Sequence, residues 1–127
     1  MESVLVIDDE FGVAELIDAV LTDEGYRVLT ASNGRQGLEV LATEPLGLVF
    51  LDYMMPVMDG AAMLESMINN PSLRGIPVVM MSSMPEATVA ARCPGYTAFM
   101  RKPFRITEIV ALTTRLMSID RTAHRWR

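Results

Sequence analysis

Cysteine, lysine and long hydrophobic runs are all scarce in this sequence of 127 residues. The single cysteine, Cys93, excludes a disulfide within the chain and a cysteine-based zinc cage, so we expect a small buried side chain there. No apolar run approaches the roughly 18 residues that a membrane-spanning helix needs. The first residues, MESVLVIDDE, carry acids where a signal peptide has a basic start. We therefore expect a soluble, cytoplasmic protein without membrane insertion.

The charged residues are unevenly distributed along the chain. Residues 1–65 hold 13 of the 16 acids and only two bases, whereas residues 66–127 hold nine bases and three acids. Lys102 is the only lysine among the 11 basic residues. A basic half is weak evidence for nucleic-acid binding, and no helix-turn-helix pattern accompanies it, so we expect no direct contact with nucleic acid. The hydrophobic content of 50% excludes intrinsic disorder.

Five short apolar runs alternate with helical patterns along the chain. The runs cover residues 3–7, 27–31, 46–51, 77–81 and 98–101. Strands that each precede a helix indicate a parallel sheet, because parallel neighbours need helical crossovers. Their almost continuous apolar character is typical of strands covered on both faces. The sequence therefore predicts an α/β fold with a doubly wound, five-stranded parallel sheet in one domain of residues 1–120. Residues 121–127 are expected to be a C-terminal tail or the start of a linker.

The helical segments carry start and stop signals. Asn33 with Gln36 predicts a capping box, and Asp59 predicts a second helix cap. The fourth helix is expected to be short, about residues 85–92, because Pro94 and Gly95 follow it. The last helix is expected over about residues 105–119. The expected inward faces are Val13, Leu16, Ile17, Val20 and Leu21 in the first helix and Ile106, Ile109, Leu112 and Leu116 in the last.

Charged and hydroxyl side chains follow the predicted strands. Ligands of such sheets bind outside the carboxyl ends of the strands, where the strand order reverses. These ends carry Asp8, Asp9 and Glu10 after the first strand, Asp52 after the third, Ser82 and Ser83 after the fourth, and Lys102 after the fifth. Clustered carboxylates repel one another, and a hard divalent cation such as Mg²⁺ relieves that repulsion. The same rim offers an aspartate nucleophile and positive charge, which are the requirements of phosphoryl transfer.

Four segments, VLVIDDE, VFLDYMMPVMDG, PVVMMSS and FMRKPF, occur in this order over nearly the whole chain. With them the sequence resembles the receiver domain of two-component response regulators. The resemblance implies a flavodoxin-like fold with strand order 2-1-3-4-5. It also implies a signalling domain, rather than a conventional enzyme, that takes a phosphoryl group from a histidine kinase or a histidine phosphotransfer protein. Phosphorylation would then change its binding to a downstream protein partner.

The resemblance also implies a role for individual residues. Asp52 matches the phosphorylated aspartate, and Lys102 matches the lysine that contacts the phosphoryl group. The remaining implied roles are Mg²⁺ binding by Asp8, Asp9, Asp52 and the backbone carbonyl of Met54, and switching by the Ser82 hydroxyl and the Phe99 ring. The Lys102–Pro103 bond matches a cis peptide of the family.

Two features depart from the family pattern. The predicted fourth helix is short, and it belongs to a face that response regulators commonly present to partners. The variable positions beside the phosphorylation site are both methionine, Met54 and Met84. A thioether orients an attacking water poorly, so we expect slow hydrolysis of the aspartyl phosphate.

Other interpretations of the same residues remain open. Taken singly, the acids after the first strand could be helix caps, Asp52 a turn residue and Lys102 a surface charge. The chain could also be a pseudo-receiver that is never phosphorylated and acts only as a protein-interaction module. A flavodoxin-like cofactor carrier would need an anion-binding loop after the first strand, where this chain has Asp-Asp-Glu. A phosphatase of the D-x-D type is disfavoured because Met54 occupies the place of the second acid.

Overall fold

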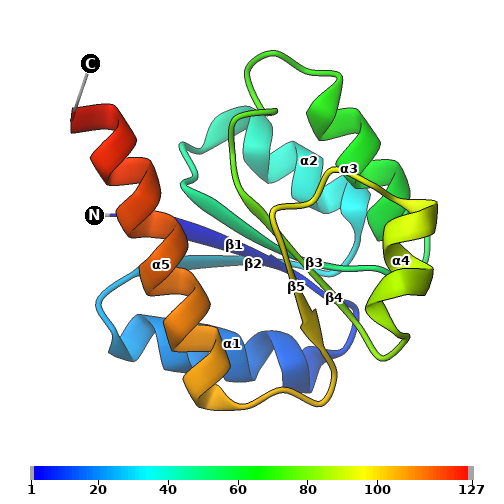
Figure 1. Ribbon diagram of the computed structural model, residues 1–127, viewed down its shortest axis with the longest axis horizontal. Coiled ribbons are helices and arrows are strands. Elements are labelled where there is room, and N and C mark those ends of the chain that lie inside the picture. The colour runs from blue at the N-terminus through cyan, green and yellow to red at the C-terminus, as the bar shows by residue number, and fades with distance from the viewer. Residues whose placement is uncertain (1, 126–127) are drawn as a thin grey trace.

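The computed structural model describes the backbone of residues 2–125 and the side chains of residues 2–117. Strands and helices alternate along this part of the chain (Figure 1). The strands are β1 (Ser3–Ile7), β2 (Arg27–Ala31), β3 (Leu48–Asp52), β4 (Val78–Ser82) and β5 (Ala98–Arg101). The helices are α1 (Phe11–Asp23), α2 (Gly34–Thr43), α3 (Gly60–Ile68), α4 (Glu86–Arg92) and α5 (Ile106–Arg125).

The five strands form one parallel sheet in the order β2-β1-β3-β4-β5. This confirms the predicted doubly wound, flavodoxin-like α/β fold and its strand order. The chain moves outward from β1 to β2 and then returns past β1 to β3, so the strand order reverses between β1 and β3. The crevice at this reversal is where such sheets bind ligands.

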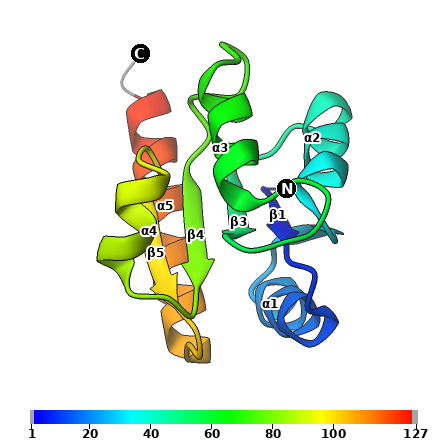
Figure 2. The same cartoon turned by 90° about the vertical axis from the view of Figure 1, so that its right-hand side faces the viewer.

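The two faces of the sheet carry separate cores. Along β1, Leu5 and Ile7 pack into the core beneath α2, α3 and α4, whereas Val4 and Val6 pack into the core beneath α1 and α5. This alternation follows from the two-residue period of a strand. Figure 1 shows α1 and α5 together on one side of the sheet, and Figure 2 shows α2 and α3 side by side on the other.

The predicted helix caps are confirmed. Asn33 Oδ1 accepts a hydrogen bond of 2.9 Å from the Gln36 backbone N–H, and Asp59 Oδ1 accepts one of 2.9 Å from the Ala62 N–H. The Gln36 side chain reaches one residue further back than a capping box predicts, because its Oε1 accepts from the Ser32 N–H at 2.9 Å. These bonds satisfy backbone donors that the first helical turn leaves unpaired.

Two strand boundaries differ from the prediction. β3 begins at Leu48 and ends at Asp52, and β4 begins at Val78 and ends at Ser82, so each ends one residue later than its apolar run. The reason is pairing: Asp52 is in register with Met81, and Ser82 with Arg101. Asp52 and Ser82 are therefore held by the ladder of the sheet.

The predicted inward faces of the first and last helices are wrong at two positions. Leu16 is 38% exposed, because the buried stripe of α1 runs through Ala14, Ile17 and Leu21. Ile106, the first residue of α5, is 53% exposed. The last helix continues to Arg125 rather than ending near residue 119, since no glycine or proline follows Pro103. The domain boundary at residue 120 stays a prediction, and the side chains of the expected tail lie outside the described residues.

The remaining predictions on packing agree with the structure. Cys93 is buried, and α4 is as short as expected. None of the described helices is long and apolar enough to cross a membrane.

Candidate functional site

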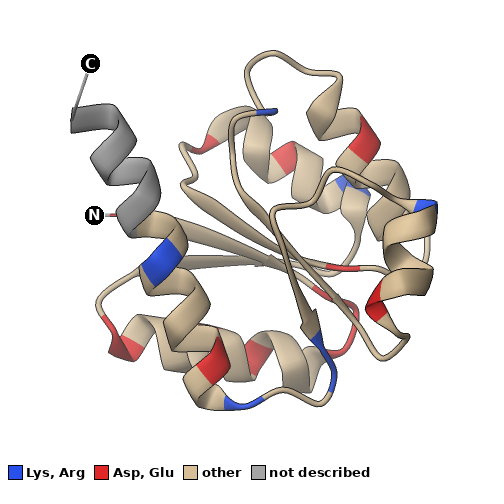
Figure 3. Ribbon diagram, viewed as in Figure 1, with Lys and Arg blue, Asp and Glu red and all other residues tan. Residues whose placement is uncertain are grey.

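Buried polar side chains gather at the carboxyl edge of the sheet. Among the described residues, five polar or charged side chains are buried, and three of them, Asp8, Asp52 and Ser82, stand at the ends of β1, β3 and β4. Lys102 follows directly after β5. Figure 3 shows acidic segments at the ends of β1 and β3 close to a basic segment at the end of β5. The predicted convergence of these strand ends is confirmed.

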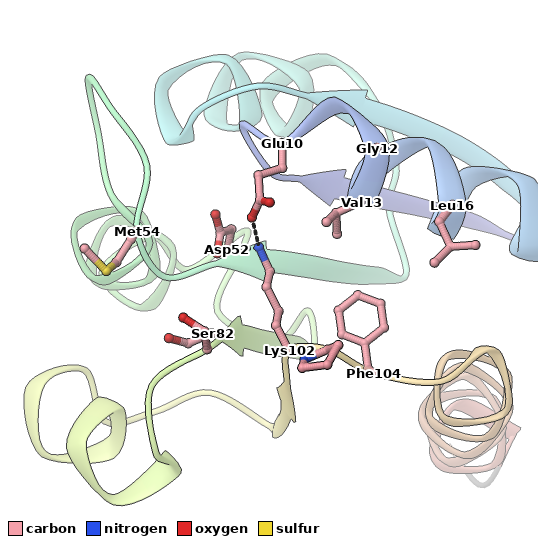
Figure 4. Close-up of a pocket in the computed structure, with 11 residues that line it drawn as sticks. Glu10, Gly12, Val13, Leu16, Asp52, Met54, Ser82, Lys102 and Phe104 are labelled. Atoms are coloured by element: carbon pink, nitrogen blue, oxygen red, sulfur yellow. Dashed lines mark hydrogen bonds and ion pairs between the residues drawn. The ribbon is translucent and has the colours of Figure 1, made fainter.

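The Lys102 ammonium lies between three carboxylates. Its Nζ is 2.9 Å from Asp8 Oδ2, 2.8 Å from Glu10 Oε1 and 3.3 Å from Asp52 Oδ1. The lysine stem crosses from the end of β5 toward the ends of β1 and β3 (Figure 4). Sequence reasoning placed Glu10 at this rim but gave it no role. The available signal was its position two residues after Asp8, because residues two apart in an extended segment point to the same side.

Burial of Asp52 and the positive charge of Lys102 shift the pKa of Asp52 in opposite directions. Burial of the carboxyl, and next the negative charge of Asp8, raise the pKa of Asp52 to about 7, although the Lys102 ammonium lowers it in part. A contact with Asp9 makes the smallest contribution to this rise. Burial by itself would lower the pKa of Lys102, but its contacts with the Glu10 and Asp8 carboxylates and the charge of Asp52 raise it overall. Lys102 is therefore a permanent cation. The ionised form of Asp52 is destabilised, because burial and the negative charge of Asp8 outweigh the attraction of Lys102.

The acidic group fits a hard divalent cation. Carboxylate oxygens of Asp8, Glu10 and Asp52 lie within 4.8 Å of one another. Asp8 Oδ2 is buried and, although close to the lysine, accepts no hydrogen bond of good geometry. All-oxygen ligands of this kind suit Mg²⁺. Asp9 is exposed and contacts Asp52 but is not in this group of three, so its assignment as a ligand stays a prediction.

A cavity of about 510 Å³ opens beside Asp52. It lies between the start of α1 and the loop that joins β5 to α5, and Ser82, Lys102 and Met54 also line it (Figure 4). Ser82 Oγ accepts a hydrogen bond of 3.0 Å from the Met84 backbone N–H, which leaves its hydroxyl proton free to donate. A small molecule or a partner side chain can therefore reach Asp52 from solvent.

The other predicted residues surround this site without lining the same cavity. Phe99 is half-buried on the face of α2, α3 and α4, and its ring centroid is 6.0 Å from that of Tyr96. Met84 is half-buried and lines a second cavity of about 470 Å³ on the Asp9 side, which Met54 also borders. Both methionines thus line this second cavity, close to the site.

The loop after β3 is closely packed against the site. Gly60 begins α3, and a Cβ atom at this position would lie 2.5 Å from the Asp52 carbonyl oxygen. Val57 adopts a φ of 68°, which is strained for a β-branched residue. The Lys102–Pro103 bond is cis, as predicted.

A comparison with protein family models matches residues 4–114 to the response regulator receiver domain. The chain belongs to this family. The receiver domain is 35% identical over 117 residues to the two-component response regulator ORR7 of Oryza sativa subsp. japonica, covering 90% of this chain and 56% of that protein. It is also 34% identical to ORR3 of Oryza sativa subsp. indica, covering 90% and 89% of the two chains.

Solved structures support the same assignment. The signal receiver domain of a signal transduction histidine kinase from Syntrophus aciditrophicus superposes with a TM-score of 0.85 at 29% identity, covering 93% of this chain and 91% of that one. The protein is therefore a receiver domain of the two-component response regulator family, a signalling domain rather than a conventional enzyme. Its acidic pocket with Lys102 is consistent with a phosphoacceptor site.

Proposed function

We propose that this receiver domain accepts a phosphoryl group on Asp52 and thereby changes its affinity for a downstream protein partner. The observation that carries the proposal is the position of the chain's only lysine, whose ammonium lies among the carboxylates of Asp8, Glu10 and Asp52 beside an open cavity. A fixed cation next to a buried aspartate is the arrangement that phosphoryl transfer requires.

The chemistry assigns one step to each side chain. An Asp52 carboxylate oxygen attacks phosphorus, and the bond from phosphorus to a histidine nitrogen of the donor breaks with its electron pair staying on that nitrogen. Lys102 Nζ and the free Ser82 hydroxyl proton stabilise the negative charge of the transferred oxygens. Ser82 and Phe99 lie on the paired strands β4 and β5, where Ala98, the residue before Phe99, is in register with Val79, three residues before Ser82. A change in the position of Ser82 would then be accompanied by a change in the position of the Phe99 ring. We propose them as the switch.

Mg²⁺ would bind on the carboxylates beside Asp52. By analogy with the family, Asp8, Asp9, Asp52 and the Met54 backbone carbonyl would hold it, and Glu10 brings a further oxygen within reach. When bound, the cation offsets the charge of the carboxylates and the incoming phosphoryl group. Asp8 Oδ2 supports this proposal, because this buried carboxylate oxygen accepts no hydrogen bond and has only the shared Lys102 ammonium, 2.9 Å away, to offset its charge.

The cavity beside Asp52 is where a phosphodonor would bind. Its rim carries apolar side chains that are exposed to solvent, including Leu16 on α1, and Phe11 and Ile106 are exposed on the adjoining helix ends. A protein that donates a phosphoryl group must place a histidine within reach of Asp52, so this apolar rim suits a helical surface of a histidine kinase or histidine phosphotransfer protein. Exposed apolar side chains that cluster on a surface commonly mark a contact with another protein.

Phosphorylation by acetyl phosphate tests the proposal directly. The chain should gain the mass of one phosphoryl group in the presence of Mg²⁺, measured by intact mass spectrometry. Asp52→Asn should abolish the gain, and chelation of the metal should prevent it. A mass gain that persists in Asp52→Asn would exclude Asp52 as the acceptor, and no gain in the parent chain would favour a pseudo-receiver.

A further inference from the structure

We infer that Glu10 is a placeholder for the phosphoryl group: its carboxylate holds the Lys102 ammonium while Asp52 is unphosphorylated and releases it when a phosphoryl oxygen arrives. The inference rests on the proposed function of Asp52. It makes Glu10 a positioning residue, which acts on the phosphoryl group only through Lys102.

Three carboxylate oxygens surround the Lys102 ammonium, and Nζ donates a hydrogen bond of 2.8 Å to Glu10 Oε1. An ammonium group has three N–H donors and no acceptor, and Nζ lies 2.8–3.3 Å from one oxygen each of Glu10, Asp8 and Asp52. A phosphoryl oxygen can bind to Nζ only if one of these carboxylates gives up its place. Phosphorylation therefore requires an exchange of partners at Lys102.

Exposure decides which carboxylate leaves. The side chain of Asp8 is 0% exposed and that of Asp52 is 6% exposed, whereas the Glu10 side chain is 62% exposed. A buried carboxylate that loses its cation keeps an uncompensated charge, whereas an exposed one is hydrated at once. Glu10 is thus the partner that can leave at low cost, and its departure also removes a negative charge from the path of the incoming anion.

The local structure supports this role for Glu10. The residue is the N-cap of α1, but its side chain makes no capping hydrogen bond. Serine, threonine, aspartate and asparagine are the side chains that cap helices well, so capping does not explain a glutamate here. Its backbone N–H donates to Asp8 Oδ1 at 2.8 Å, which fixes the start of the side chain beside the site. The longer glutamate stem then reaches Lys102 from across the cavity (Figure 4).

Binding of beryllium trifluoride, a phosphoryl mimic, provides the first test. Affinity is measured by calorimetry at a Mg²⁺ concentration that saturates each protein. Glu10→Gln should bind the mimic about two- to fivefold more tightly than the parent chain, the range expected for loss of one exposed ion pair. The control is Glu15→Gln, which removes the same charge from an exposed position of α1.

The outcomes separate this inference from the proposed function. Tighter binding in Glu10→Gln but not in Glu15→Gln supports the placeholder. Unchanged or weaker binding in Glu10→Gln, or an equal gain in both variants, overturns it while the function of Asp52 stands. No binding to the parent chain, with the same result for Asp52→Asn, overturns both.

A second test follows the lysine itself. Lys102 is the only lysine, so selective nitrogen labelling gives a single side-chain ammonium signal in NMR spectra. The signals of the parent chain and of Glu10→Gln should differ in the free proteins, because only one has the Glu10 contact. They should converge when beryllium trifluoride and Mg²⁺ are bound, since Glu10 has then left in both. A difference that persists at full size in the bound forms would contradict the release.

Discussion

Asp52 combines a nucleophile with an unfavourable environment. The carboxyl is buried at the end of β3 beside Asp8, and its pKa rises to about 7 from the ordinary value of 3.8. The folded protein therefore binds more protons at this residue than the unfolded chain does between about pH 4 and pH 7. Stability decreases as the pH rises through that window, because ionised Asp52 is tolerated less well in the fold than in water.

We expect Asp52→Asn to stabilise the metal-free protein at alkaline pH. At pH 8, in the presence of a chelator, the free energy of unfolding should rise by on the order of 2 kcal/mol, because the substitution removes the cost of keeping an ionised carboxylate buried. At pH 5 the gain should be clearly smaller, since Asp52 is then protonated in the folded protein and only the lower part of the pH window has been crossed. Urea titrations at both values measure the effect, and an equal gain at pH 5 and pH 8 would show that charge is not its cause.

Met54 and Met84 should lengthen the life of the phosphorylated state. Hydrolysis requires a water in line with phosphorus, and a thioether offers that water only a weak acceptor. Met54→Asn combined with Met84→Glu supplies a donor and an acceptor at the opening between them. The double variant should lose phosphate about tenfold faster at the same pH and Mg²⁺ concentration, which corresponds to about 1.4 kcal/mol in the barrier. Equal decay rates would assign the methionines to packing or partner contact.

The start of α3 packs closely against the main chain of the site. Asp59 caps the helix, and Gly60 places its backbone against the Asp52 carbonyl and the Tyr53 backbone. Both neighbours of the absent Cβ are main-chain atoms, so neither can rotate away. The start of α3 is therefore packed directly against the main chain at the end of β3.

Gly60→Ala should destabilise the fold by about 1–3 kcal/mol, the usual cost of forcing extra volume into a packed region. The matched control is Gly12→Ala in α1, where no atom lies within 4 Å of the added methyl group. That substitution should be neutral or stabilise by up to about 1 kcal/mol, since alanine favours a helix more than glycine. Thermal unfolding of both variants measures the contrast. A neutral Gly60→Ala would mean that the loop after β3 can shift freely.

The sheet brings the two oppositely charged halves of the molecule together at one edge. The acids of the site come from β1 and β3 in the acidic half, and Lys102 comes from the end of β5 in the basic half. One ammonium offsets only part of three carboxylate charges. A divalent cation bound there adds to the stability of the entire fold, because it binds the folded state alone.

Mg²⁺ should therefore raise the melting temperature of the chain. At a concentration one hundred times its dissociation constant, the gain is about 2.7 kcal/mol. Asp9→Ala should remove this response, if Asp9 is a ligand, while scarcely lowering the stability of the metal-free protein. Glu15→Ala is the control and should keep the full shift. If Asp9→Ala also keeps it, Asp9 is not a ligand, and the buried carboxylates of Asp8 and Asp52 hold the cation without it.

Much of this molecule could be predicted from its sequence. Periodicity and apolar runs determine the five strands and five helices, because each pattern buries its apolar face in only one type of element. The caps at Asn33 and Asp59 depend on bonds within a few residues, so local sequence decides them too. The gathering of Asp8, Asp52 and Lys102 follows from the parallel order, since all strands end at the same edge.

Only the tertiary structure decided which side chains meet. Asp9 and Glu10 are both acidic and adjacent, yet it is Glu10 that pairs with Lys102, a residue 92 positions away in the sequence, because the fold brings that lysine to the end of β1. Leu16 and Ile106 match a helical apolar face in sequence but remain exposed. Their exposure depends on the angle at which α1 and α5 lie on the sheet, and that angle is set by packing among distant residues. Sequence thus determined the elements and their order, and packing decided the contacts between them.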